Sequence, residues 1–469
     1  MKSLQVDKKQ LFLVAGYLFS IISIILLPGM VSMAVSLLFA VIAIGLGYYS
    51  VKIENRKAST VILLLPVMMS AFQNIYLGIG AWHLTPFCVQ VLLSLHFILF
   101  SGITFLMVYS VNQKAQWAVF SIAVLLLQSA ILFAVYPAPF TSALSSIRNI
   151  LSCMLIYCFG IVMNKSADTR AYYKWVTRIS WFVVLFGLLE WFTGLKVWEA
   201  LNISRLWDLK GIPLNVGGIP PNWYSSEQIR GNLIRRMVSS FADPVNLGTF
   251  LFAAFMIAWY RKNRVLTFFL AICALFTVSK GALLGFLVFI VVYVWQSKRF
   301  RVFLPVMAGV SLAVGLLFIR YSLTSSSGSI IAHARGFISA FSVLAEHPMG
   351  LGVGNVGVLA GLFNESLLDS SVSETGVGMI IAQLGIVGIT IYVFFFTKLG
   401  LLPRKWKMME TIHDMQRERI LYYTLLFAFI ANALFNEVAL SPNSCGLYFI
   451  ELAFLNSNAE LRCESIIRE

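Results

Sequence analysis

The sequence predicts an all-α, polytopic integral membrane protein with two long external loops that contain short helices. Three observations predict it. Of the 469 residues, 59% are hydrophobic and only 12% are charged, and the mean hydropathy is +0.84. The apolar residues form long runs, and a helix needs about 20 of them to cross a membrane, so about 12–14 transmembrane helices are expected. The basic residues lie in short clusters between these runs, as in membrane proteins that use positive charge to set their orientation.

The apolar runs define the expected spans and the division of the chain. The spans lie near 11–28, 30–50, 60–80, 87–110, 117–136, 147–163, 179–194, 244–260, 265–279, 281–296, 302–320, 375–400, 420–440 and 445–457. The resulting segments are N-terminal transmembrane helices (1–194), a first long loop (195–243), central transmembrane helices (244–320), a second long loop (321–374), and C-terminal transmembrane helices with a cytoplasmic tail (375–469). The run near 11–28 is expected to be a retained span, because no small-residue cleavage site follows it.

The distribution of charge predicts one orientation. With the N-terminus in the cytoplasm, every second link carries at least one Lys or Arg, whereas the links 81–86, 137–146 and 441–445 contain neither. Both long loops then lie outside. This pattern accounts for most of the net charge of +15 and argues against nucleic-acid binding, which needs a single basic patch. Membrane lipids are therefore the expected surroundings.

Familiar signatures of soluble enzymes and metal sites are missing from the sequence. The six cysteines have no zinc-type spacing, and no P-loop, H-E-x-x-H or G-x-S-x-G motif occurs. Acidic residues do not cluster as a divalent cation would require. We therefore expect neither a metal nor a cofactor.

The second long loop contains a helical pattern followed by a turn. Over 332–346 one polar stripe runs along the predicted helix: Arg335, Ser339, Ser342 and Glu346. Pro348 should end this helix, because the residue before a proline is pushed out of the α region. Three glycines then permit a tight, closely packed return: Gly350, Gly352 and Gly354. We interpret this segment as one wall of a site.

Arginines in the first loop lie where the orientation rule places few positive charges. They are Arg230, Arg235 and Arg236. Snorkelling to lipid phosphates could account for one or two of them. Together with Arg335 of the second loop, the cluster favours a seat for a lipid-linked phosphate or pyrophosphate, because the planar guanidinium donates two parallel hydrogen bonds and is always charged. Aromatic residues of the same loop are either interfacial anchors or platforms for sugar rings: Trp198, Trp207, Trp223 and Tyr224.

Further candidate residues lie next to the predicted spans. Lys280, in Ser279-Lys280-Gly281, is either a snorkelling residue at a hairpin tip or a fourth cation of the site. Glu374, which follows Asp369 at the start of a span, could accept a proton from a hydroxyl nucleophile. Its alternative is a helix cap or first-turn residue favoured by the helix dipole. His347 is interpreted as a local hydrogen-bonding residue.

Three motifs together resemble the O-antigen polymerase and ligase superfamily. They are R-M-V-S-S-F-A-D-P-V-N-L-G (236–248), T-V-S-K-G-A-L-L-G (277–285), and H-P-M-G-L-G followed by E-T-G-V-G-M-I-I-A-Q-L-G-I-V-G (347–352 and 374–388). The second motif has Lys280 where the family usually has arginine. The order and spacing of the motifs, with the topology, carry the resemblance over the architecture of the whole chain.

The resemblance implies a metal-independent glycosyltransferase of the GT-C type in the bacterial inner membrane. It would act at the periplasmic face on undecaprenyl-pyrophosphate-linked glycans, with a chain-length regulator as a candidate partner. Arg236 and Arg335 would hold the pyrophosphate with help from Lys280, and Glu374 would be the base or would orient the acceptor. Arg230, Arg235, His347 and Asp369 complete the expected substrate site.

Two other functions are the alternatives to this polymerase. A ligase would transfer the glycan to lipid A core. Ligases carry a His-Asn pair where this chain has Glu374-Thr375, which favours a polymerase. A flippase or other transporter should show internal repeats and charged or broken helices at mid-membrane, and the sequence shows no convincing repeat.

Overall fold

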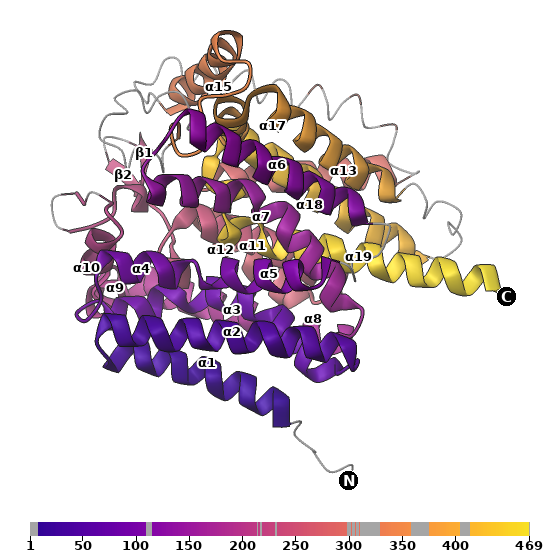
Figure 1. Ribbon diagram of the computed structural model, residues 1–469, viewed down its shortest axis with the longest axis horizontal. Coiled ribbons are helices and arrows are strands. Elements are labelled where there is room, and N and C mark those ends of the chain that lie inside the picture. The colour runs from indigo at the N-terminus through magenta and orange to yellow at the C-terminus, as the bar shows by residue number, and fades with distance from the viewer. Residues whose placement is uncertain are drawn as a thin grey trace.

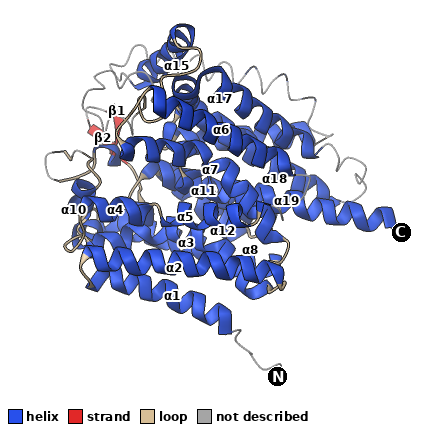
Figure 2. Cartoon of the chain, in the orientation of Figure 1, coloured by secondary structure: helices blue, strands red, loops and turns tan. Residues whose placement is uncertain are grey.

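The computed structural model shows one bundle of long helices with short elements gathered at one end (Figures 1 and 2). It describes residues 8–108, 115–212, 214–215, 218–229, 232–297, 302, 305, 309, 329–357, 375–403 and 413–468, with the side chains of 226–229, 232, 329–335, 413–414 and 460–468 left out. The long helices lie roughly side by side, and the first helix covers one flank of the bundle. The chain is therefore an all-α, multi-pass membrane protein.

Many consecutive helices are joined by short links, such as the two residues between α1 and α2. The long and medium helices are α1 (Lys8–Leu26), α2 (Gly29–Lys52), α3 (Arg56–Gly80), α4 (Pro86–Leu93), α5 (Leu95–Leu106), α6 (Gln116–Val135), α7 (Phe140–Asn164), α8 (Thr169–Thr193), α11 (Pro244–Tyr260), α12 (Arg264–Phe276), α13 (Lys280–Gln296), α15 (Ser329–Glu346), α17 (Gly376–Leu401), α18 (His413–Phe435) and α19 (Pro442–Arg468). The short elements are α9 (Lys196–Ala200), α10 (Ile203–Leu209), η3 (Pro221–Trp223), β1 (Tyr224–Ile229), β2 (Asn232–Arg235), η4 (Ser239–Phe241) and η8 (Glu437–Leu440).

Side-chain caps explain where several of these helices begin. The side chains of Asn55, Asp168, Asp243, Asn263 and Thr375 each accept a hydrogen bond from a backbone N–H in the first turn of α3, α8, α11, α12 and α17, respectively. Such a cap satisfies one of the otherwise unpaired N–H groups at a helix start. Thr375 supplies the side-chain cap of α17. Glu374 lies outside the described residues, so both interpretations of it stay predictions.

The predicted spans agree with the helices in most places. Within the described ranges, eight helices are long and apolar enough to cross a membrane, and nine if α4 and α5 count as one span. The run predicted near 87–110 is broken at Ser94, where α4 and α5 meet at 45°. α19 begins at Pro442 and is much longer than the predicted 445–457. Most of the predicted span 302–320 lies outside the described residues, and the expected total of 12–14 spans stays a prediction.

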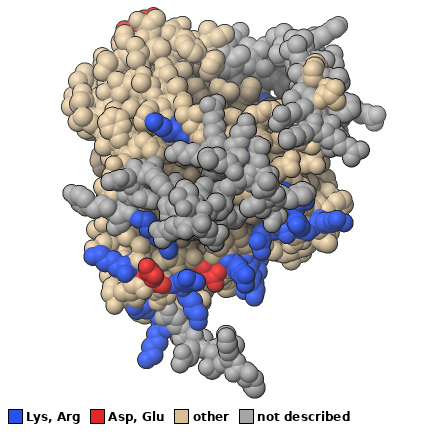
Figure 3. All heavy atoms as spheres, turned by 90° about the vertical axis from the view of Figure 1, so that its right-hand side faces the viewer, with Lys and Arg blue, Asp and Glu red and all other residues tan. Residues whose placement is uncertain are grey.

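The two ends of the bundle differ in charge. We call one end the basic face; it holds the start of α8 and the link Arg261–Asn263, joined through Tyr173, whose ring lies 5.0 Å from the Arg261 guanidinium. Figure 3 looks onto the side of the molecule where a band of Lys and Arg runs across the surface. We call the opposite end the loop face; it holds the end of α3, α9, α10 and the two-stranded hairpin of β1 and β2. The hairpin is antiparallel and was not predicted.

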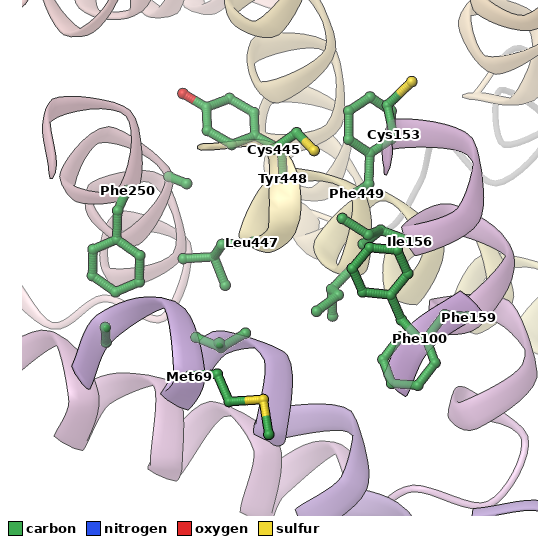
Figure 4. Packing of buried hydrophobic residues seen from close by; sticks show 14 of the residues in the cluster. Met69, Phe100, Cys153, Ile156, Phe159, Phe250, Cys445, Leu447, Tyr448 and Phe449 are labelled. Atoms are coloured by element: carbon green, nitrogen blue, oxygen red, sulfur yellow. The ribbon is translucent and has the colours of Figure 1, made fainter. Parts of the chain in front are cut away.

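The core of the bundle is built around α7 and α19. Figure 4 shows Leu447 of α19 between Phe250 of α11 and Ile156 of α7, and all three line one small internal cavity. Gly160 lets α7 approach α19 closely, because a Cβ on this glycine would lie 2.6 Å from Cβ of Ala453. Small residues at such contacts are typical of helix packing in membranes.

Aromatic residues of the first loop are part of this core. For Trp198 and Trp223, which are the most deeply buried, neither role expected from the sequence holds: they are not interfacial anchors and not platforms for sugar rings. Trp198 is fully buried and Trp223 is 2% exposed, and their rings meet edge to face at 5.9 Å. Trp207 is also buried, at 4%. A ring enclosed by protein neither anchors the chain to lipid nor presents a face to a sugar. These tryptophans instead attach the first loop to the helices below it.

Replacing Gly160 by valine should destabilise the protein by about 1–3 kcal/mol, because the new side chain overpacks the contact between α7 and α19. Gly45 of α2 is the control, since no atom lies within 4 Å of the position its Cβ would take. We expect a lower melting temperature in detergent for Gly160→Val and little change for Gly45→Val. Equal melting temperatures for the two variants would contradict the packing described here.

Candidate functional site

Arg236 lies at a corner of the loop face where two of the three motifs meet. Its Nε donates to the backbone carbonyl of Thr277 at 2.8 Å, and its Nη1 donates to the carbonyl of Asn222 at 3.1 Å. The backbone continues the contact, because Met237 N donates to Phe276 O at 2.9 Å. Two fixed hydrogen bonds set the plane of a guanidinium, so the Arg236 side chain is oriented before any ligand arrives.

A buried carboxylate holds the segment that carries Arg236. Glu190 of α8 is completely buried and forms an ion pair with Arg235. Its other oxygen accepts hydrogen bonds from the backbone N–H groups of Val238 at 3.2 Å and Ser239 at 3.4 Å. Arg235 also donates to the carbonyl oxygens of Glu190 and Trp191. Glu190 therefore fixes the chain on both sides of Arg236, and Arg235 has a structural task; its expected contact with substrate stays a prediction.

The turn between α12 and α13 places Lys280 beside this corner. Lys280 is the first residue of α13, three residues after Thr277. Ser279 is 1% exposed, and its hydroxyl has no hydrogen-bond partner among the described residues. A Cβ on Gly281 would overlap the amide of Asn432 in α18. The turn is thus packed against a neighbouring helix, and Lys280 begins the helix that follows it; both interpretations of Lys280 stay predictions.

A further cation, Lys210, lies in the first loop itself, at the end of α10. Nζ of Lys210 donates to Oδ1 of Asn74 at 2.8 Å, and Asn74 in turn donates to the carbonyl of Phe241. Burial lowers the pKa of Lys210 to about 8, and the Asp243 carboxylate opposes part of that drop. Asp243 also accepts a hydrogen bond from Asn222, whose carbonyl binds Arg236. Lys210 and Arg236 are thereby linked through one polar network that sequence reasoning missed.

The third motif forms a second corner, where its two halves bind each other. Leu351 N donates to Ala382 O at 2.8 Å, Gly352 N to Gln383 O at 3.1 Å, and Ile386 N to Pro348 O at 2.9 Å. These bonds are possible because α17 is interrupted at Gly385, where φ is 60° and ψ is −147°. The predicted turn is confirmed: α15 ends at Glu346, and Gly350, Gly352 and Gly354 all have positive φ values.

Two buried polar residues that were not expected lie at this second corner. Gln383 is fully buried and binds the backbone of the return at Gly354 N and Val356 O. Glu437 of η8 is 3% exposed, and a Cβ on Gly357 would lie 3.2 Å from both of its carboxylate oxygens. Glu437 is thus a carboxylate at the end of the glycine-rich return. Its position inside the apolar run predicted as the span 420–440 was the available signal, since ionisable residues within such runs are functional candidates.

Several predicted site residues cannot be placed. Arg230, Asp369 and Glu374 lie outside the described residues, and of Arg335 only the backbone, in α15, is described. The structure therefore brings Arg236 together with the Lys280 turn but does not test whether Arg335 joins them. His347 follows α15, with its ring 6.3 Å from that of Tyr136. Across the described ranges, no group of three or more His, Cys, Asp or Glu residues could hold a metal.

A further charged residue, Arg148 of α7, lies within a membrane-type helix. It donates to the hydroxyl of Ser94 at the break between α4 and α5, at 3.2 Å. His96, two residues after Ser94, is 2% exposed, and neither ring nitrogen has a hydrogen-bond partner in the described part of the chain. Arg148 and His96 therefore make the break in this span polar.

Comparisons with known proteins leave the family open. No family model matches the chain, and no curated protein matches it. The functional argument consequently rests on the residues and their geometry.

Replacing Glu190 by glutamine should destabilise the protein by about 3–5 kcal/mol, because Arg235 would keep its charge in a site built for a carboxylate. Arg205→Gln, in the first loop, is the control. The ion pair of Arg205 with Asp208 is exposed, with side chains 47% and 63% accessible, and such pairs contribute at most about 1 kcal/mol. Thermal unfolding of both variants measures the difference. Similar losses in the two would mean that Glu190 does not hold this segment.

Lys210 should make stability depend on pH in the alkaline range. Between about pH 8 and 10.5 the unfolded chain keeps a proton that folded Lys210 has released, so the contribution of this residue to stability rises with pH in that window. The melting temperature of wild type, measured relative to that of Lys210→Met, should therefore rise from pH 8 to pH 10. Lys196→Met, on the exposed surface of the same loop, should follow wild type. Parallel profiles for wild type and Lys210→Met would contradict the assignment.

Proposed function

We propose that this protein is a membrane glycosyltransferase that polymerises undecaprenyl-pyrophosphate-linked oligosaccharide repeat units, such as those of O-antigen, at the periplasmic face of the bacterial inner membrane. The observation that carries the proposal is the contact between Arg236 and Thr277. It joins two motifs 41 residues apart that were singled out by their resemblance to one superfamily. The proposed fold type is that of GT-C enzymes.

The orientation of the protein supports this location for the site. Lys and Arg gather on the basic face, which the positive-inside rule assigns to the cytoplasm. The loop face, with Arg236 and the turn before Lys280, would then lie at the periplasmic surface. A pyrophosphate attached to a lipid presents its charge at this depth, whereas its polyprenyl chain remains among apolar helices. A soluble anion would need no such surroundings.

The chemistry requires charge stabilisation and one proton acceptor. A hydroxyl oxygen of the acceptor sugar attacks the anomeric carbon of the donor chain, and the bond from that carbon to the pyrophosphate oxygen breaks. The electron pair leaves with undecaprenyl pyrophosphate, so negative charge grows there in the transition state. Arg236, Lys280 and Arg335 would stabilise that charge. Glu374 would take the hydroxyl proton or align the acceptor. No metal is needed in this scheme.

The fixed orientation of Arg236 supports its proposed role. Because backbone carbonyls already hold its plane, little side-chain freedom is lost when phosphate binds, and charge stabilisation costs no reorganisation. A lysine at this position would supply the positive charge but not the two parallel hydrogen bonds that a planar guanidinium donates to phosphate. Glu190 and Asn222 serve this residue as positioning groups.

The test is incubation of the purified protein with one defined lipid-linked repeat unit, with product length read on a gel. Wild type should yield a ladder of polymers. Arg236→Ala and Arg236→Lys should lower the rate by about 100-fold or more, as when one donor to a developing charge is removed. Arg205→Gln, in the same loop but in an exposed pair, should keep the wild-type rate.

Each outcome of this experiment decides between functions. A ladder that persists in Arg236→Ala would exclude the proposed site. Transfer of glycan to lipid A core, with no ladder from repeat units alone, would identify a ligase. Absence of any new glycosidic bond, together with movement of the lipid-linked unit across a vesicle membrane, would identify a transporter.

A further inference from the structure

A groove on the basic face has both apolar walls and unneutralised positive charge. It has a volume of about 390 Å³ and lies between α11, α12 and the start of α18. Phe255, Trp259 and Phe268 form its apolar part, whereas Lys262, Arg264 and Arg417 form its charged part. Among the described residues, no Asp or Glu lines it. Sites of about 300–1,000 Å³ that combine apolar walls with a few polar groups are typical of small-ligand binding.

Within the described ranges, the cations of this groove form no ion pair. Lys262 and Arg264 are exposed, and neither forms an ion pair within the described part of the chain. Nη1 of Arg417 is buried and has no hydrogen-bond partner among the described residues. Its guanidinium carbon lies 5.5 Å from the centre of the Trp259 ring, which fixes its position over one wall of the groove. A buried donor without a partner is costly, so a ligand that accepts a hydrogen bond is favoured here.

The shape of the groove fits a ligand that is partly in the membrane. Phe255 lies seven residues before Lys262, which places the apolar end about 10 Å deeper along α11 than the charged end. On α12, Phe268 is 61% exposed, so one wall opens toward the hydrocarbon of the bilayer. A free anion would occupy only the charged end, and an acidic peptide would have no access through that wall.

We propose that this groove binds an anionic phospholipid of the cytoplasmic leaflet. Its phosphodiester would accept hydrogen bonds from Lys262, Arg264 and Arg417, and its acyl chains would lie along Phe255 and Phe268. Basic pockets between membrane helices on the cytoplasmic side bind acidic lipid head groups by this combination of contacts. The site is distinct from the loop face and does not depend on the glycosyltransferase proposal.

The test measures which lipid stays with the purified, full-length protein. The protein is equilibrated with vesicles of equal parts phosphatidylglycerol and phosphatidylcholine, extracted in mild detergent, and weighed intact by mass spectrometry. Wild type should retain one phosphatidylglycerol and no matching phosphatidylcholine. Each of Lys262→Gln, Arg264→Gln and Arg417→Gln should weaken retention about fivefold, as expected for removal of one cation near a lipid head group. Ala271→Trp, which fills the groove and keeps all three cations, should abolish retention.

A matched pair on the same end of the bundle is the control. Arg178 lies over Trp175 in α8, 4.6 Å from its ring centre, but neither residue lines the groove. Arg178→Gln should retain phosphatidylglycerol as wild type does. The proposal is overturned if Arg178→Gln loses the lipid as readily as Arg417→Gln, if phosphatidylcholine is retained equally, or if Ala271→Trp keeps its lipid. None of these outcomes bears on polymer formation at the loop face.

Discussion

The buried ion pair of Glu190 with Arg235 is the constraint on which the loop face depends. A carboxylate at this depth is costly unless hydrogen bonds and an opposite charge compensate it. Glu190 obtains one charged partner and two backbone N–H groups, all from a stretch of five residues, 235–239. These contacts to Glu190 fix the position at which the chain turns after strand β2. That place fixes Arg236 against the carbonyl of Thr277.

The backbone next to this contact is irregular on both sides. Ser239, Ala242 and Val278 have positive φ values although none is glycine, which is costly and is found where the surroundings impose it. The second corner also contains residues with positive φ, but these are glycines, which adopt such angles at little cost. Irregular backbone at membrane depth is tolerated where it packs inside protein or lines a cavity. Both corners therefore have irregular backbone that packs inside the protein.

The sequence predicted the positions of the helices better than it predicted which residues contact one another in space. Apolar runs and turn residues locate most helices, because hydropathy and proline act locally. The break at Ser94 lies within a mostly apolar run, and the polar residues near it, Ser94 and His96, are too few to predict the end of a span from hydropathy. Arg235 and Arg236 look alike in sequence, yet one faces Glu190, 45 residues away, and the other faces Thr277. The different roles of Arg235 and Arg236 follow from the packing of α8 against the first loop, which the sequence does not reveal. Glu190 itself could have been noticed as a lone acid at the end of an apolar run.

Positive charge serves two different purposes at the two ends of the molecule. At the loop face, Arg235 and Arg236 are held by a carboxylate and by backbone carbonyls, so their positions are set by the fold. At the basic face, Lys262, Arg264 and Arg417 border a groove with no acidic residue among its described lining. A fixed cation is suited to charge that appears briefly in a transition state, because no reorganisation is then required. A cation without an acidic partner in its groove is instead suited to a resident anion, which supplies the missing counter-charge.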